Sequence, residues 1–208
     1  MLIQDLSLQK RQFFITLIKK RVKSGTGSSR EFLHKRTWTY PVSNLNSIIK
    51  QAPFVIVGGV ATRLYMPERM TLDINILIKA EDCELVYQNL QNANSKKIGD
   101  LSISGSQWQL ADNTSLDVLV GDDEWVSEAI YQPNYAPDGL PIIPLPYLIL
   151  MKLSASRTQD LADISRMLGL AKEKELIKIR QVVEQYLPTA MEDLESLIML
   201  GKLEVEGN

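Results

Sequence analysis

The stretch Phe54–Lys79, FVIVGGVATRLYMPERMTLDINILIK, decides the fold that we expect for this chain. It opens with the apolar run FVIV, which is followed by Gly58 and Gly59 and then by VATRLYM, a segment with the composition of a short helix. A pair of glycines after an apolar run is typical of a tight turn. We therefore predict a strand, a glycine turn and a helix in direct succession.

From residue 71 onward the same stretch changes to a period of two. Thr71, Asp73 and Asn75 alternate with apolar residues. Because successive side chains of a strand point to opposite faces, these three would share one face of a second strand. Oxygen ligands on one face suit a magnesium ion. Such sites are usually built from two carboxylates, and here the second is an amide.

Further elements are expected on both sides of this stretch. Apolar periodicity predicts a short helix before it, a helix after it, a hairpin with Asp117 in its second arm, and then a helical C-terminal part. The expected bounds are 41–52, 81–93, 106–120, and about 146–168, 173–187 and 189–201. We therefore expect an α/β (α+β) fold, in which a small mixed β-sheet is flanked by helices and followed by a helical part.

The chain is expected to divide into three segments. The loop 132–146, rich in Pro and Gly, is the predicted boundary between sheet and helices. The segments are a basic N-terminal helical arm (1–40), an α/β domain (41–145) and a C-terminal helical part (146–208).

The N-terminal arm differs in charge from the rest of the chain. Residues 1–36 hold nine Lys or Arg and two acidic residues, although the whole chain has a formal net charge of -2. Such an arm can attract a polyanion such as tRNA. The alternative is a solvated amphipathic helix, over 5–22, on the surface of the protein itself.

Composition excludes several classes of protein and of chemistry. A hydrophobic fraction of 45% with 23% charged residues is ordinary for a soluble globular protein, and the apolar runs are too short to span a bilayer. We recognise no secretory signal and expect a cytoplasmic protein without membrane partners. One Cys and one His exclude an internal disulfide and argue against a histidine metal cage or a Ser-His triad. Carboxylates, hydroxyls, basic side chains and backbone amides must carry the chemistry.

A second polar cluster is expected in the C-terminal part. If residues 146–168 form one helix, Lys152, Ser156, Asp160 and Asp163 share one stripe of it. This stripe could face a nucleotide, with Lys152 meeting phosphate and one aspartate orienting it. The alternative is a solvent-facing stripe held by ion pairs, in which Asp160 bonds its neighbour Arg157 at the i,i+3 spacing.

Other residues also have two interpretations. The glycine pair could bind phosphate through backbone N–H groups, or it could be a plain turn. Arg69 could contact a triphosphate or an acceptor, or it could pair with a carboxylate. We expect Arg63 at the surface, and Trp108 and Trp125 in the core.

Two segments, in this order, carry a family resemblance: GGVATRLYMPERMTLDIN and LPYLILMKLSASRTQDLADISRML. They resemble the signature of the nucleotidyltransferase-fold superfamily, the DNA-polymerase-beta-like group, in the form of AbiEii-type toxin nucleotidyltransferases. The resemblance covers roughly residues 51–168. It implies a nucleotidyltransferase-like fold that moves a nucleoside monophosphate (NMP) from a nucleoside triphosphate (NTP) to a hydroxyl of tRNA or of a protein. It also implies a toxin-like system with an antitoxin-like partner.

The resemblance also implies roles for individual residues. Catalytic carboxylates would be Asp73 and Asp117, and together with Asn75 they would hold Mg²⁺ or Mn²⁺. The implied nucleotide-binding residues are Gly58, Gly59, Arg69, Thr71, Lys152, Asp160 and Asp163.

Asn75 departs from the family pattern, because it stands where the second carboxylate belongs. An amide oxygen can coordinate a cation but supplies no negative charge. The sequence therefore also allows a catalytically reduced protein of the same fold that binds a nucleotide or a partner chain. A third interpretation is a protein with a helical interface, in which the glycines and aspartates are structural.

Overall fold

The computed structural model describes residues 43–66 and 73–206. The predicted arm 1–40, its helix over 5–22, and the candidate residues Arg69 and Thr71 lie outside the described residues.

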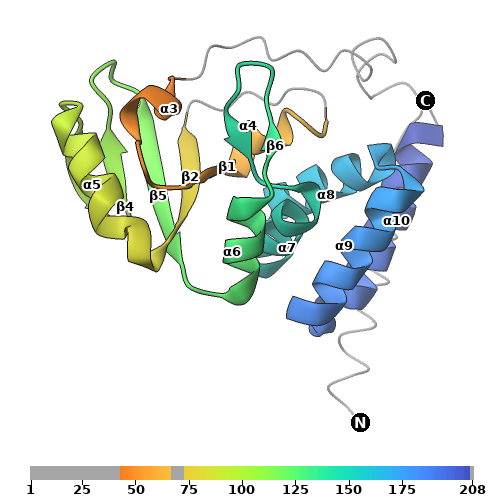
Figure 1. Ribbon diagram of the computed structural model, residues 1–208. Helices are drawn as coiled ribbons and strands as arrows, with labels where there is room; N and C mark the ends of the chain where they lie inside the picture. The colour runs from red at the N-terminus through yellow and green to blue at the C-terminus, as the bar shows by residue number, and fades with distance from the viewer. Residues whose placement is uncertain (1–42, 67–72, 207–208) are drawn as a thin grey trace.

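The described elements comprise one mixed sheet and two groups of helices (Figure 1). The strands are β1 (Val55–Val57), β2 (Ile74–Lys79), β3 (Lys96–Asp100), β4 (Gly105–Gln109), β5 (Ser115–Gly121), β6 (Asn134–Tyr135) and β7 (Pro141–Ile142). The helices are α3 (Leu45–Ile48), α4 (Gly58–Thr62), α5 (Cys83–Asn92), α6 (Glu124–Tyr131), α7 (Leu145–Ala155), α8 (Thr158–Leu170), α9 (Glu173–Tyr186) and α10 (Met191–Glu206), and 3₁₀ turns cover Ala80–Asp82 and Pro188–Ala190. In Figure 1, α7 and α8 lie between the sheet and the pair α9 and α10.

The strand order is β3-β4-β5-β2-β1-β7-β6 in the described part of the chain. β2 lies in the middle, antiparallel to β1 and parallel to β5. The predicted hairpin is present, because β4 and β5 pair antiparallel. The expected fold class, a mixed sheet flanked by helices and followed by a helical part, is confirmed.

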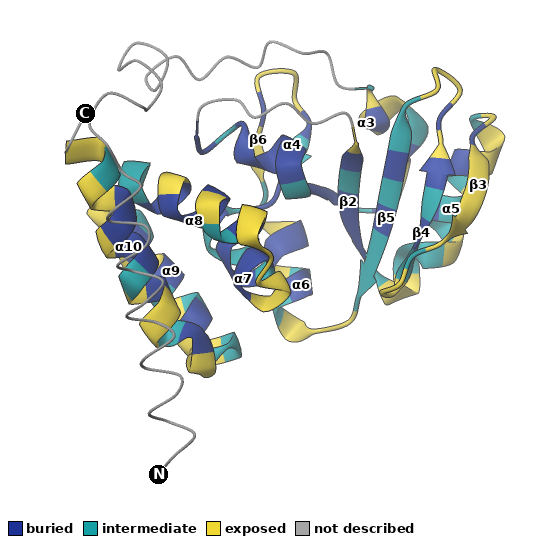
Figure 2. Ribbon diagram, turned by 180° about the vertical axis from the view of Figure 1, so that it is seen from behind, coloured by how far each residue is buried: buried dark blue, intermediate teal, exposed yellow. Residues whose placement is uncertain are grey.

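The period-two pattern of β2 and β5 gives one buried apolar face and one face that is polar around Asn75 and Asp117, although the buried Leu77 also lies on the second face. Ile74 and Ile76 of β2 and Leu116 and Val118 of β5 are buried (Figure 2). They lie on the same face as Trp108 of β4, which is paired with Leu116. Trp108 is 1% exposed and contacts Tyr87 of α5, with ring centroids 5.3 Å apart, so its predicted place in the core is confirmed. The opposite face is left for the polar residues between these positions.

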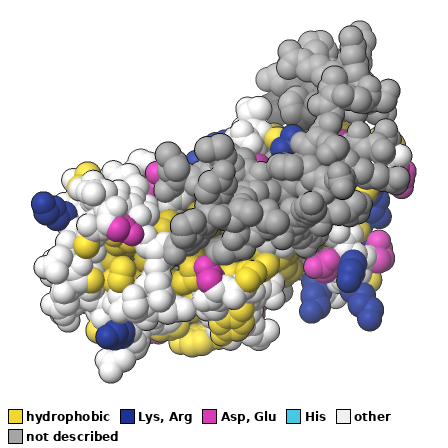
Figure 3. All heavy atoms as spheres, turned by 90° about the horizontal axis from the view of Figure 1, so that it is seen from above, with side chains coloured by type: hydrophobic (Ala, Val, Ile, Leu, Met, Phe, Trp, Pro, Cys, Tyr) yellow, Lys and Arg dark blue, Asp and Glu magenta, His cyan; other side chains and the backbone are white. Residues whose placement is uncertain are grey.

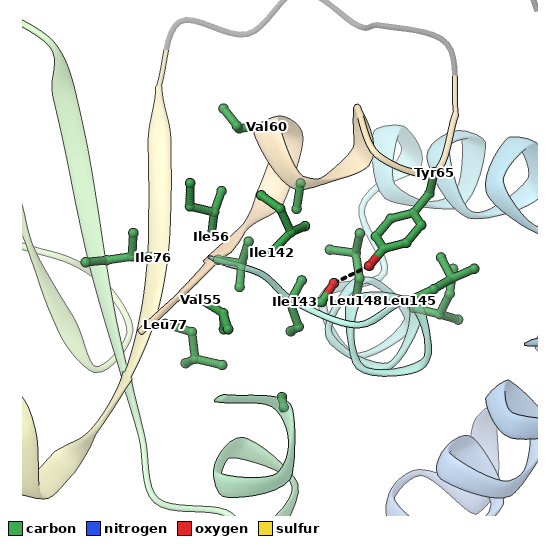
Figure 4. Packing of buried hydrophobic residues seen from close by; sticks show 14 of the residues in the cluster. Val55, Ile56, Val60, Tyr65, Ile76, Leu77, Ile142, Ile143, Leu145 and Leu148 are labelled. Atoms are coloured by element: carbon green, nitrogen blue, oxygen red, sulfur yellow. Dashed lines mark hydrogen bonds between the residues drawn. The ribbon is translucent and has the colours of Figure 1, made fainter. Parts of the chain in front are cut away.

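The loop predicted over 132–146 is not irregular throughout. It contains β6 and β7, and β7 pairs parallel with β1 through Ile56 and Ile142. Figure 4 shows how this region packs: the hydroxyl of Tyr65, which follows α4, donates to the carbonyl of Ile143 at 2.6 Å. The buried hydrophobic cluster continues from here into the C-terminal helices. The proposed three-segment division stays a prediction.

The single helix predicted over 146–168 is wrong, because the structure has two helices with a break at Ser156. This residue has φ 49° and ψ 26°, a left-handed conformation that ends α7. Arg157 is extended and precedes the first turn of α8. No Gly or Pro marks the break, and the apolar pattern continues through it. The sequence therefore gives no sign of the break. The expected helices over 173–187 and 189–201 correspond to α9 and α10.

Helices α8 and α10 approach each other closely at two glycines. A Cβ at Gly169 would lie 2.3 Å from the carbonyl oxygen of Gly201, and a Cβ at Gly201 would lie 2.0 Å from that of Ser165. No side chain atom fits at either position unless the two backbones move apart.

Replacing Gly201 with alanine is therefore expected to destabilise the protein by about 1–3 kcal/mol, the usual cost of overpacking. This loss should exceed the gain of about 1 kcal/mol from the higher helix propensity of alanine. Urea unfolding measures the change. Gly99→Ala is the matched control, because a Cβ there meets nothing within 4 Å. A Gly201→Ala variant as stable as the wild type would contradict the close helix contact.

Candidate functional site

A cleft of about 1100 Å³ lies beside the polar face of the central strands. Its walls come from the end of β1, the start of β2, the middle of β5, the start of α4, residues 101–103, and parts of α6, α7, α8 and α9. Seven of the predicted site residues line it: Gly58, Gly59, Asp73, Asn75, Asp117, Lys152 and Asp160. Residues far apart in sequence thus meet in one cleft, and the role of each stays a prediction.

The glycine turn forms one end of this cleft. Gly58 has φ +65°, a conformation that side chains rarely adopt, and a Cβ there would lie 2.8 Å from Nδ2 of Asn75. Glycine is therefore required at this position both by the backbone and by the neighbouring strand. The predicted helix follows directly, although α4 covers only five residues.

The polar face of β2 and β5 holds the candidate metal ligands. Asn75 pairs in register with Asp117 on the parallel neighbour strand. Gln107 Nε2 of β4 donates to Oδ1 of Asp117 at 3.2 Å. Asp73 precedes β2 and is exposed. Two carboxylates and one amide are therefore presented on the same side of the sheet.

The two carboxylates interact electrostatically. Burial raises the pKa of Asp117 above its ordinary value of 3.8, the bond from Gln107 lowers it, and the negative charge of Asp73 raises it further. Among the described residues, no Lys or Arg forms an ion pair with either carboxylate. Two neighbouring carboxylates without a basic partner favour a bound cation.

The donor set fits a single hard divalent cation. Asp73, Asn75 and Asp117 offer only oxygen ligands, which Mg²⁺ prefers, and waters or phosphate oxygens can complete its coordination. Within residues 43–66 and 73–206, no group of three or more His, Cys, Asp or Glu side chains comes together as a metal site.

The second predicted cluster is a buried ion-pair network across the break between α7 and α8. Lys152 Nζ donates to Asp160 Oδ1 and to Asp163 Oδ2, each at 2.8 Å. Arg157 Nε donates to Asp160 Oδ2 at 2.6 Å, and Gln159 Nε2 donates to Asp163 Oδ1 at 3.1 Å. Burial opposes ionisation of Asp160, but the bonds from Arg157 and Lys152 outweigh it and lower the pKa of Asp160. Three of the four residues of the predicted stripe meet in this network.

The fourth residue of the stripe does not join the network. The Ser156 hydroxyl donates to the carbonyl of Leu153. The alternative i,i+3 pair between Arg157 and Asp160 is present, but Asp160 is buried rather than solvent-facing. Asp163 is fully buried and does not line the cleft.

Two expectations for other residues were wrong. Arg63, expected at the surface, is 5% exposed, because α4 packs against β2. Trp125, expected in the core, is only half-buried and lines the cleft. Its ring stacks on Tyr147 of α7, with centroids 6.3 Å apart. The residue follows the acidic pair Asp123 and Glu124 at the start of α6, and this was the signal that could have placed it near the surface.

The surface gives a mixed picture of charge. Seen from above, the charged side chains of the described residues lie in small groups of both signs (Figure 3). The basic segment predicted to meet a polyanion falls on residues 1–36, outside this description. No helix in the described ranges is both long and apolar enough to cross a membrane.

One prediction concerns the stability cost of Asp117. Because its pKa is raised in the folded state, ionisation above that pKa destabilises the fold, and this cost disappears as the pH falls toward 3.8. We expect Asp117→Asn to melt at a higher temperature than the wild type at pH 7 in metal-free buffer. Asparagine keeps an Oδ1 acceptor for Gln107. The difference in melting temperature between the two proteins should vanish near pH 3.5. A lower melting temperature of Asp117→Asn at pH 7 would contradict the raised pKa of Asp117.

Comparison with known proteins gives limited matches. No protein-family model and no curated protein matches the chain. It is similar to a crystal structure of ANT(2")-Ia in complex with adenylyl-2"-tobramycin, with 16% sequence identity and a TM-score of 0.42 over 74% of this chain and 89% of that chain. It is also similar to a solution structure of the antibiotic-resistance factor ANT(2'')-Ia, with 17% identity and a TM-score of 0.40 over 74% and 86% of the two chains. Similarity at this level establishes neither the family nor the activity of this chain.

Proposed function

We propose that the protein is a metal-dependent nucleotidyltransferase. It would move an NMP from an NTP to a hydroxyl of tRNA or of a protein, with loss of pyrophosphate. One observation carries the proposal: a single cleft is lined by the glycine turn, by Asp73, Asn75 and Asp117 on the polar side of the sheet, and by the ion-pair network of α7 and α8.

The residues of the cleft divide into a metal side and a phosphate side. Asp73, Asn75 and Asp117 would hold Mg²⁺ or Mn²⁺, which when bound would neutralise phosphate charge and lower the pKa of the acceptor hydroxyl. Gly58 and Gly59 would approach the phosphates closely, because neither carries a side chain. Thr71 and Arg69 are proposed as further nucleotide contacts.

The proposed reaction requires few reactive groups of the protein. The acceptor oxygen would attack the α-phosphorus in line, the bond between the α-phosphorus and its bridging oxygen would break, and pyrophosphate would leave. The hydroxyl proton needs a base, and the carboxylate of Asp117, beside the bound cation, is proposed for this role. Gln107 donates to its Oδ1 and would help to fix its orientation.

A second candidate function is favoured by Asn75. Without the second carboxylate the site has less negative charge, and the same fold would then bind a nucleotide or a partner chain without transfer. The enzyme and the nucleotide-binding form of this protein both need an NTP site in the cleft and differ in turnover, whereas the partner-binding form needs no NTP site.

A transfer assay separates the two functions. Each α-³²P-labelled NTP is incubated with the protein, Mg²⁺ or Mn²⁺, and either total tRNA or cell lysate. Label moved to tRNA or protein by the wild type supports the enzyme. Transfer by Asn75→Asp alone points to the catalytically reduced protein. Absence of both transfer and NTP binding in the two proteins would contradict the nucleotidyltransferase and the nucleotide-binding protein, and would leave the partner-binding alternative.

We extend the proposal to a toxin-like role in the cytoplasm with an antitoxin-like partner, on the basis of the family resemblance. Expression of the wild type in a bacterial host would then arrest growth, and Asp73→Ala would relieve the arrest. Equal growth of both strains at equal protein levels would contradict the toxin role while leaving the transfer activity untouched.

A further inference from the structure

We propose that Arg157 is the side chain that contacts the terminal phosphates of the nucleotide, and that Asp160 and Lys152 position it. The inference rests on the proposed function, because it requires an NTP in the cleft. It assigns the phosphate contact to a residue other than Lys152, the basic residue that the sequence favours.

Lys152 is poorly placed for a phosphate. Its side chain is only 7% exposed, and its ammonium group donates to two aspartates at 2.8 Å each. A phosphate contact would have to replace one of these bonds and leave a buried carboxylate with one partner fewer. Such a loss is costly in a buried site. Lys152 therefore holds α7 and α8 together.

Arg157 has the opposite environment. It lines the same cleft, and its side chain is 76% exposed. A guanidinium group has five N–H donors in a planar fork, and the bond to Asp160 uses the Nε–H. Arginine in this form can hold one acid through Nε and still present its terminal nitrogens to a phosphate.

Buried side chains also fix the position of the Arg157 guanidinium group. Asp160 accepts from Arg157 on Oδ2 and from Lys152 on Oδ1, so both oxygens of its carboxylate are fixed. Lys152 is fixed in turn by Asp163. The backbone at Arg157 lies between the left-handed Ser156 and the first turn of α8. The exposed guanidinium group of Arg157 is thus bonded to a buried carboxylate, which is itself held by the buried Lys152.

The charges of the cleft lining also favour Arg157 as a phosphate contact. Its described lining includes five carboxylates and two basic side chains: Asp73, Asp117, Asp123, Glu124 and Asp160, with Lys152 and Arg157. The charge of Lys152 is offset by the two aspartates that hold it. A cation at Asp73 and Asp117 would serve the phosphates near the sheet. Arg157 is then the basic side chain of the described lining that remains to contact the terminal phosphates.

Calorimetric titration with ATP, GTP, CTP and UTP in Mg²⁺ tests the proposal. The NTP bound most tightly by the wild type is then compared with its monophosphate. Arg157→Ala is expected to weaken NTP binding by roughly tenfold to hundredfold, the range for a charge-assisted hydrogen bond, and to leave monophosphate binding unchanged. Arg157→Lys should recover part of the loss, since lysine keeps the charge without the fork.

Two further variants separate contact from positioning. Arg166→Ala removes an exposed arginine of α8 that does not line the cleft, and it should bind like the wild type. Asp160→Asn keeps an acceptor for Lys152 but loses the charge that holds Arg157. It should therefore lower the ratio of triphosphate to monophosphate affinity. Melting curves confirm that each variant is folded.

The outcomes distinguish this inference from the proposed function. Equal NTP affinity in Arg157→Ala and the wild type would overturn the role of Arg157 and leave the nucleotidyltransferase proposal standing. A parallel loss of triphosphate and monophosphate binding would also overturn it, because a terminal-phosphate contact affects only the former. A wild type that binds none of the four NTPs would overturn both.

Discussion

Asp73→Ala is expected to abolish nucleotide transfer. Asp73 is the exposed carboxylate of the proposed metal site, and its negative charge raises the pKa of Asp117. Without it, the cation would keep one carboxylate and one amide as protein ligands. Lewis-acid stabilisation by a metal is worth several kcal/mol, and every 1.36 kcal/mol corresponds to a factor of ten in rate. We therefore expect the rate of transfer to fall at least about a hundredfold.

The matched control for this change is Asp100→Ala. Asp100 is an exposed aspartate of the edge strand β3, where it pairs with Lys97 at 2.7 Å, and it does not line the cleft. This variant should transfer at the wild-type rate. Melting temperatures of both variants show whether a loss of activity reflects unfolding. Full transfer by a folded Asp73→Ala variant would contradict the assigned metal site.

Lys152→Met is expected to have the largest effect on stability. Methionine fills much of the volume of lysine but leaves the buried Asp160 and Asp163 without the ammonium group that bonds both of them. Breaking a buried ion pair by removing one partner typically costs about 3–5 kcal/mol. Urea unfolding at pH 7 measures this loss. Lys178→Met, at an exposed position of α9, is the control and should change stability little.

The loss of stability in Lys152→Met is expected to depend on pH. In the wild type the lowered pKa of Asp160 stabilises the fold above pH 3.8, and this contribution is lost as the pH falls through the folded pKa. In Lys152→Met the cost comes from ionised carboxylates, so the difference from the wild type should shrink in acid. Adding Asp163→Leu to Lys152→Met should recover stability at pH 7. A single variant as stable as the wild type would show that the network is not a stabilising element.

Local patterns of the sequence account for most of the sheet. The alternation after Asp73, the run before Gly58 and the hairpin around Asp117 predict β2, β1, β4 and β5, because one face of each strand must be buried. The edge strand β3 was not predicted, because its five residues are all exposed and show no apolar alternation. The short strands β6 and β7 were missed within the Pro-rich loop. Strands of two residues contain too few positions to show a period, and their pairing with β1 depends on a distant segment.

Part of the cleft lining was predictable from the sequence, but its geometry was not. Asp73, Asn75 and Asp117 are identified by strand alternation and by resemblance, and they do line one cleft. The break at Ser156 was not predictable, because no Gly or Pro accompanies its left-handed backbone. Without this break, Lys152 could not be assigned to the buried network, nor Arg157 to the surface of the cleft.

Binding of Mg²⁺ and NTP to the purified protein tests the central claim most directly. The account predicts that at least one of ATP, GTP, CTP and UTP binds in the presence of Mg²⁺. It also predicts that EDTA weakens this binding, and that Asp73→Ala weakens it as much as EDTA does. If none of the four nucleotides binds a folded wild-type protein, or if binding is the same in EDTA and in Asp73→Ala as in Mg²⁺, the cleft is not a metal-dependent nucleotide site.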